Sequence, residues 1–284
     1  MTYLCVKSGY DIVLGVTSDN KVELFYYTDG LVYNTQNISS NGKTYFRYQR
    51  RSEQEKANLD KIFTKPLNLG NKKLDFALHT PPLLKKDMTE DNHRKSRFIN
   101  WDIVVKTNKN LIDFYNDYPI SADGVFMTKF TRLAETHLSE ETKAQIYPSM
   151  KELLSGSDQL TNVNKLLSWI QYGFEYQTDE KVWGHDHPFF PEETLYYPYS
   201  DTEDRSGLFA RLVIDLLGLK TIYLYSEQLH HVAIGVHFTD KDVEGESYIY
   251  EGEKYIICDP TYYGASAGKV MKKWATTAAA PIKL

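Results

Sequence analysis

The 284-residue sequence lacks the features that define several specialised classes of protein. Its two cysteines, Cys5 and Cys258, are too few and too far apart for a disulfide framework or a cysteine-rich zinc site. It has no run of about 18 apolar residues, so no transmembrane segment is predicted. Basic residues number 33 against 38 acidic ones and form no stripe, which argues against binding to nucleic acid.

The N-terminus and the histidines exclude two further features. Residues 1–7 have neither the basic region nor the apolar region of a signal peptide, so we expect none in this chain. The localisation stays unknown, because a cell-envelope or secreted protein would require a leader removed before Met1. His185 and His187 form a pair without a third ligand at suitable spacing, so no metal is predicted, and no cofactor either.

Aromatic residues are abundant, with 22 Tyr, 13 Phe and 4 Trp. Tyrosines in this number favour β-strands and suit clefts that hold sugars or extended peptides. Hydrophobic residues make up 42% and charged residues 25%, which is close to the average of globular proteins and enough for a sizeable core.

The first part of the chain has the pattern of short strands. Residues 11–16 and 22–27 are β-rich runs, and Asp29-Gly30 and Asn41-Gly42 are dipeptides typical of hairpins. We therefore expect a β-rich N-terminal region over residues 1–125. Within it, the pattern favours a short helix in 51–60, a solvated loop in the mixed-charge run 85–97, a strand in 98–105 and a helix in 111–118.

The second part combines helices with strands. Apolar residues recur at helical spacing over 163–174, after a cap at Thr161 or Asn162, and over 208–217, where Gly218 ends the helix. The three prolines of 183–200 argue against a helix there. Four strands should follow, and 275–280 has the composition of a frayed tail. The expected architecture of residues 126–284 is α+β, with helices packed on an antiparallel sheet of the segments 221–225, 231–238, 247–250 and 254–259.

Three short motifs occur in a suggestive order. Residues 201–206 begin a helix, His231 begins a strand, and Asp259-Pro260-Thr261 ends the following hairpin. This order resembles the transglutaminase-like superfamily, a papain-like fold of cysteine peptidases and amide-bond enzymes, over roughly residues 150–270. The stretch 196–218 is similar to bacterial members in which a cysteine stands between two acids. The resemblance implies a Cys-His-Asp triad at Thr202 (nucleophile position), His231 (general base) and Asp259 (orienting carboxylate).

The chemistry of such a triad explains why Thr202 matters. A thiolate is stabilised by the positive end of a helix dipole and by a nearby imidazolium. A threonine hydroxyl is a poor nucleophile without an activating base such as an N-terminal amine, and Thr202 is internal. As simpler alternatives, Thr202 is a helix N-cap and His231 is a half-buried strand histidine. Cys258 should point away from Asp259 and serve as a core thiol, because side chains alternate along a strand.

The resemblance implies a cysteine peptidase or amide hydrolase scaffold that is catalytically inactive because of Thr202, either as a natural pseudoenzyme or as an engineered variant. The alternative is a non-catalytic peptide- or glycan-binding or structural module with an aromatic cleft. In either case the expected partners are a peptide, a protein or a cell-wall fragment. We expect His231 and Asp259 to lie within hydrogen-bond reach, with Thr202 facing the other imidazole nitrogen. The residues predicted to line the cleft are Trp183, Phe189, Phe190, Tyr196 and Tyr197.

Overall fold

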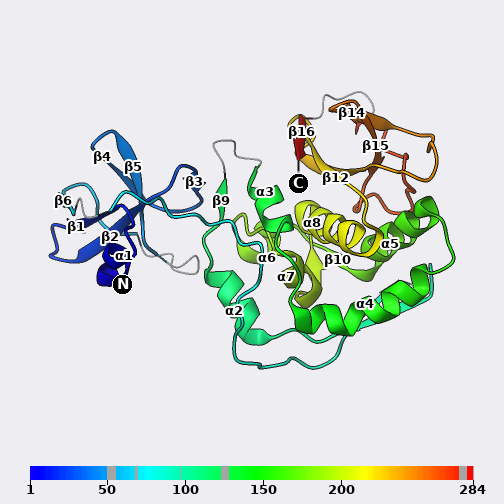
Figure 1. The fold of residues 1–284 in the computed structure, drawn as a ribbon, viewed down its shortest axis with the longest axis horizontal. Coiled ribbons are helices and arrows are strands. Elements are labelled where there is room, and N and C mark those ends of the chain that lie inside the picture. The colour runs from blue at the N-terminus through cyan, green and yellow to red at the C-terminus, as the bar shows by residue number, and fades with distance from the viewer. Residues whose placement is uncertain (50–55, 68–69, 97, 123–127, 275–279, 284) are drawn as a thin grey trace. The chain divides into compact units, whose positions relative to one another are not determined.

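The computed structural model describes residues 1–49, 56–67, 70–96, 98–122, 128–274 and 280–283 (Figure 1). The chain forms two compact units, the first from Met1–Ala77 and Asn116–Lys129, the second from Leu78–Tyr115 and Phe130–Leu284. The first is β-rich and the second combines helices with an antiparallel sheet, so the predicted α+β class and β-rich N-terminal region are confirmed. Within the described ranges, no helix is long and apolar enough to cross a membrane.

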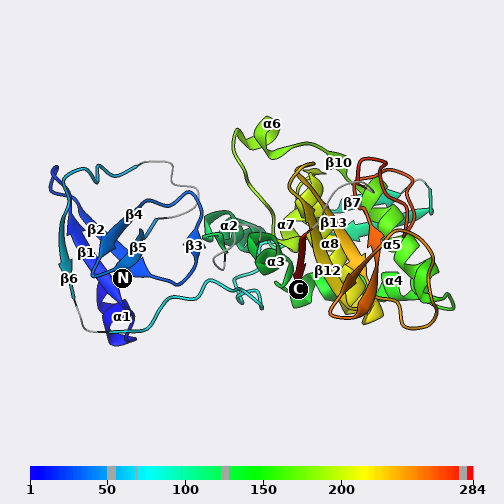
Figure 2. The same cartoon turned by 90° about the horizontal axis from the view of Figure 1, so that it is seen from above.

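The first unit is built on a five-stranded antiparallel sheet in the order β4-β5-β2-β1-β6. The predicted strand pair is present, with Val13 opposite Phe25. Asn41 and Gly42 both have positive φ, 52° and 74°, and close the predicted hairpin between β4 and β5. α1 packs beside β1 (Figure 2). The elements are α1 (Thr2–Lys7), β1 (Ile12–Val16), β2 (Val22–Tyr27), β4 (Asn37–Ser40), β5 (Lys43–Arg47) and β6 (Phe63–Pro66).

One expectation for this unit was wrong. Asp29-Gly30 does not join two paired strands, because β3 (Leu31–Val32) pairs with β9 (Ser121–Ala122). This pairing spans a long distance in the sequence, which a local pattern does not contain. Of the segment 51–60, where a short helix is expected, residues 51–55 lie outside the described residues, and 56–60 are not helical.

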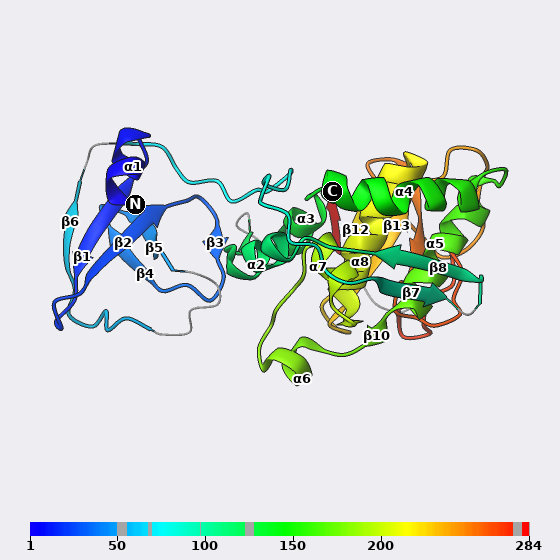
Figure 3. The same ribbon diagram turned by 90° about the horizontal axis from the view of Figure 1, so that it is seen from below.

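The second unit contains the sheet β14-β15-β13-β12-β16, and all its strand pairs are antiparallel. α8 packs against β12 and β13, α4 packs on β8, and α5 packs on β7 (Figure 3). Residues 275–279 of the expected tail lie outside the described residues, and the segment after them forms an edge strand. The strands are β7 (Asn92–Ser96), β8 (Trp101–Val105), β10 (Glu175–Tyr176), β11 (Tyr199–Ser200), β12 (Thr221–Ser226), β13 (His231–Val236), β14 (Ser247–Tyr250), β15 (Glu253–Cys258) and β16 (Ala280–Lys283).

The helices agree with the predicted segments but not with every predicted end. Asp158, rather than Thr161 or Asn162, caps α5, because its carboxylate accepts the N–H of Thr161. Gly218 ends the second helical segment with φ +66°, as predicted. The helical elements are α2 (Lys109–Asp117), α3 (Thr128–Ala134), α4 (Glu140–Leu154), α5 (Gln159–Gly173), α6 (Asp179–Trp183), α7 (Pro191–Tyr196), α8 (Thr202–Leu212) and a π-helical turn (Val213–Leu217).

Two segments expected to be loops contain regular structure. α7 lies inside 183–200, because Pro191 occupies its first position, where the missing N–H costs no intrahelical hydrogen bond. β7 lies inside the mixed-charge run 85–97, and its Arg94 is buried. The Arg94 guanidinium donates to the carbonyl oxygens of Leu195 and Tyr196, so tertiary contacts satisfy a charge that the sequence pattern assigned to solvent.

Candidate active site

The start of α8 positions Thr202. Asp201 is the N-cap, so Thr202 is the first helical residue and the alternative of a Thr202 cap is wrong. The Asp204 carboxylate accepts the N–H of Asp201 at 3.1 Å and the N–H of Phe189 at 2.8 Å, which attaches the preceding loop to the helix. Thr202 is 7% exposed, and its hydroxyl lies 3.3 Å from that of Tyr176. The N–H groups of a first helical turn carry the positive end of the helix dipole.

His231 and Asp259 form a direct hydrogen bond, with 2.9 Å between Nε2 and Oδ2. β13 and β15 are neighbours in the sheet, and this pairing brings the first residue of β13 close to the residue after β15. Both side chains are largely buried, and the Trp274 ring packs edge-on against the imidazole at 5.6 Å. Because the carboxylate accepts, Nε2 carries the proton in the neutral ring and Nδ1 is the basic nitrogen.

The Asp259-Pro260-Thr261 motif fixes the orienting carboxylate. Oδ1 of Asp259 accepts from the N–H and the hydroxyl of Thr261, both at 2.9 Å, and from the N–H of Tyr262 at 3.1 Å. These three donors leave Oδ2 directed at His231. The amide of Gln171 donates to the backbone oxygen of Asp259 at 3.0 Å and ties the motif to α5. The motif is therefore a device for holding one carboxylate oxygen toward the imidazole.

α8, which begins at Thr202, belongs to the same compact unit as this pair. It packs on β12 and β13, and His231 is the first residue of β13. A direct contact between Thr202 and His231, and the roles of the three residues, stay predictions.

The residues predicted to line a cleft lie in different environments. Phe189 and Phe190 are 4% and 2% exposed. Phe189 stacks on Tyr197 at 4.8 Å, and Phe190 stacks on a tyrosine of α2 at 4.4 Å, so both rings belong to the core. Trp183, Tyr196 and Tyr197 are half-buried, and their role in binding stays a prediction. The buried thiol of Cys258 has a pKa raised by its burial, which confirms the prediction of a core thiol.

Exposed aromatic residues lie elsewhere around Thr202. Tyr176 contacts its hydroxyl, and the buried guanidinium of Arg205 lies under the rings of Tyr176 and Tyr263, at 5.4 and 5.7 Å. The ring centroid of Tyr263 lies 5.4 Å from that of Tyr172, and the ring centroid of Tyr172 lies 4.1 Å from that of Phe98. Sequence reasoning missed this row; the signal was the pair of tyrosines directly after the Asp259 motif.

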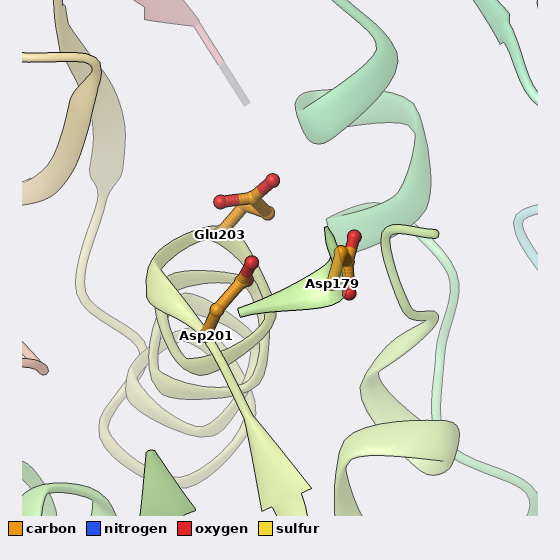
Figure 4. A group of neighbouring side chains, drawn as sticks. All are labelled: Asp179, Asp201 and Glu203. Atoms are coloured by element: carbon orange, nitrogen blue, oxygen red, sulfur yellow. The ribbon is translucent and has the colours of Figure 1, made fainter. Parts of the chain in front are cut away.

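Three carboxyl groups gather at the first turn of α8. Oxygen atoms of Asp179, Asp201 and Glu203 lie within 4.8 Å of one another (Figure 4). Burial raises the pKa of Asp201, and repulsion from Asp204 and Glu203 raises it further. Carboxylate oxygens are the ligands of hard cations such as Ca²⁺ or Mg²⁺, so these three residues could hold one. The sequence analysis considered only His185 and His187, because Asp179 belongs to a different helix.

The raised pKa of Asp201 makes stability depend on pH. Above the unfolded-state value of 3.8, the folded protein keeps a proton that the unfolded chain has released, so rising pH favours unfolding.

We expect Asp201→Asn to raise the free energy of unfolding at pH 8 by about 1–2 kcal/mol, the equivalent of roughly one pKa unit. Denaturant unfolding in EDTA from pH 4 to 9 measures this. The advantage of the variant should vanish near pH 4, and exposed Asp242→Asn should change little at any pH. An advantage that does not grow with pH would contradict the prediction.

Comparison with known proteins identified no family. No family model matches the chain, and no curated protein matches it. Two solved structures are similar to part of it. Legionella pneumophila LapG is 16% identical with a TM-score of 0.32, and the match covers 55% of this chain and 82% of LapG. An EGTA-treated form of LapG has the same identity and TM-score, and the match covers 55% of this chain and 80% of that one.

Proposed function

We propose that the second unit is a transglutaminase-like cysteine peptidase scaffold that is catalytically inactive because Thr202 occupies the nucleophile position. The observation that carries the proposal is the 2.9 Å hydrogen bond between His231 and Asp259, at the end of a sheet against which α8 packs. The scaffold predicted for residues 126–284 then extends to β7 and β8, which belong to the same compact unit.

The hydrogen bond between His231 and Asp259 supports the proposed roles. Asp259 holds the Nε2 proton of His231, so Nδ1 would take a proton from a nucleophile and return it to a leaving amine. The N–H groups of the first turn of α8 would stabilise an oxyanion. Thr202 impairs this sequence at its first step, because a hydroxyl forms far less anion than a thiol at neutral pH and the threonine methyl group crowds the attacking oxygen.

Iodoacetamide labelling of a Thr202→Cys variant tests the proposal. Cys5→Ser is added to remove the other accessible thiol, while Cys258 is left in place because it is buried. We expect the labelling rate to reach its plateau below neutral pH, because the helix N-terminus and the imidazolium lower the pKa of the thiol. Mass spectrometry of peptides identifies the labelled residue.

His231→Ala in the Thr202→Cys background is the control. It should return the labelling profile to the range of a free thiol, near pH 8.5. Because Thr202 is buried and the Glu203 carboxylate belongs to the same turn, both of which oppose a thiolate, the helix alone does not lower the pKa of the thiol enough. A profile that is independent of His231 would refute the proposed triad and favour a structural module.

A non-catalytic binding module is the second candidate. It is favoured by the exposed aromatic row beside Thr202, formed by Tyr176, Tyr263, Tyr172 and Phe98. An inactive scaffold that keeps a binding surface combines both candidates.

A further inference from the structure

A row of four aromatic side chains lies at the surface of the second unit: Phe98, Tyr172, Tyr263 and Tyr176. Tyr176 is 42% exposed, Tyr263 49% and Phe98 61%. Ring contacts join Phe98 to Tyr263 through Tyr172, and the guanidinium of Arg205 joins Tyr263 to Tyr176. Contiguous exposed aromatic surface of this kind marks an interaction site more often than scattered apolar residues do. The row ends at the hydroxyl of Thr202.

The row is supported from inside the protein. Arg205 is fully buried, and its guanidinium lies under the rings of Tyr176 and Tyr263. The same guanidinium donates to the carbonyl oxygen of Phe174 at 2.7 Å and to the Tyr263 hydroxyl at 3.4 Å. Two rings of the row are therefore held in place before any ligand binds, which reduces the entropy lost on binding.

The end of the row at Thr202 is acidic. Oxygen atoms of Asp179, Asp201 and Glu203 lie within 4.8 Å of one another, and Glu203 is the one of the three that is half-buried rather than buried, so its carboxylate provides the negative charge that reaches solvent. The guanidinium of Arg205 is the opposing charge, and it is engaged by backbone oxygens. The acidic groups are Asp179, Asp201, Glu203, Asp204 and Asp259.

We propose that the row binds an extended peptide segment whose apolar residues lie on Phe98, Tyr172 and Tyr263 and whose Lys or Arg side chain lies at Tyr176 and Glu203. A cation at that position is attracted both by the Glu203 carboxylate and by the face of an aromatic ring. The rings are tilted by 36° between Phe98 and Tyr172 and by 46° between Tyr172 and Tyr263.

This inference deepens the proposed function by naming a ligand class for the same site, and binding needs no working nucleophile. The experiment therefore uses the chain with Thr202 unchanged. The probe is a fluorescein-labelled peptide of repeating Lys-Ala-Pro, and fluorescence anisotropy measures its affinity in EDTA, so that no metal ion competes for the carboxylates. We expect micromolar binding, and no binding of the matched Glu-Ala-Pro peptide.

Variants locate the binding surface. Tyr263→Ala should weaken binding about tenfold, and Tyr263→Phe should keep most of it, because the ring provides the contact. Glu203→Gln should weaken binding of the Lys peptide at low salt, with a smaller loss at high salt. Tyr48→Ala is the matched control, since Tyr48 is also 49% exposed but lies in the first unit, and Glu244→Gln is the control for charge.

Three results would overturn the proposal: no binding of the Lys peptide up to millimolar concentration, equal binding of both peptides, or binding that Tyr263→Ala leaves unchanged. Preferential binding of a labelled N-acetylglucosamine oligomer would also overturn it, in favour of a glycan surface. None of these results depends on the thiol chemistry of Thr202→Cys, so the failure of this inference is distinguishable from the failure of the proposed triad.

Discussion

The Thr202→Cys variant, with Cys5→Ser, is expected to be acetylated by p-nitrophenyl acetate at neutral pH at least about 100 times faster than the chain with Thr202. The expectation follows from the proposed function, in which His231, hydrogen-bonded to Asp259, is the general base and the first turn of α8 provides N–H groups for the oxyanion. Release of nitrophenol measures the rate, and mass spectrometry shows an acetyl group on residue 202.

The His231→Ala substitution tests whether the acetylation rate depends on the general base. In the Thr202→Cys background, His231→Ala should reduce acetylation by about two orders of magnitude, which is the usual contribution of a general base. Asp259→Ala should also reduce it, because the imidazole loses its orientation and its fixed proton. Ile249→Ala on exposed β14 should have no effect. Rapid acetylation of the chain with Thr202 itself would show that the site is active as written.

The Arg205→Met substitution is expected to lower the free energy of unfolding by about 3 kcal/mol, because it leaves several buried acceptors without a donor. The Arg205 guanidinium donates to the carbonyl oxygens of Phe174 and Gln171, at 2.7 and 3.3 Å, and its Nε donates to the Ser200 hydroxyl at 3.2 Å. Urea unfolding followed by tryptophan fluorescence measures the change.

Arg205→Lys distinguishes charge from geometry. A lysine keeps the positive charge but offers its donors from a single point, so it cannot reach carbonyl oxygens at two sites at once. We expect it to recover less than half of the lost stability. Lys241→Met, at a partly exposed surface pair, should change stability by less than about 0.5 kcal/mol. Full recovery by lysine would mean that Arg205 acts only through its charge.

Local patterns were sufficient where neighbours in sequence decide the structure. Helical spacing located α5, and the glycine after the second helical segment located its end. Runs of β-favouring residues located β1 and β2, and Asn41-Gly42 located a hairpin. The order of the motifs also suggested that His231 and Asp259 would lie close together, as they do.

Positions that depend on distant partners were predicted less well. Pro191 seemed to exclude a helix, but it occupies the first position of one, where it costs no hydrogen bond. Arg94 seemed to belong to a solvated loop, but carbonyl oxygens of α7 satisfy its guanidinium. Phe189 and Phe190 seemed available to a ligand, but their neighbours in the fold bury them.

The sequence by itself therefore determined the α+β class, the strands and helices with strong periodicity, and the pairing of His231 with Asp259, because propensity and motif order act over short distances or through one hairpin. Only the tertiary structure decided which aromatic residues remain exposed beside Thr202 and which carboxyl groups meet at the start of α8. Burial and electrostatic repulsion depend on every element packed around a group, and Asp179, Tyr176 and Tyr263 reach this place from separate segments of the chain.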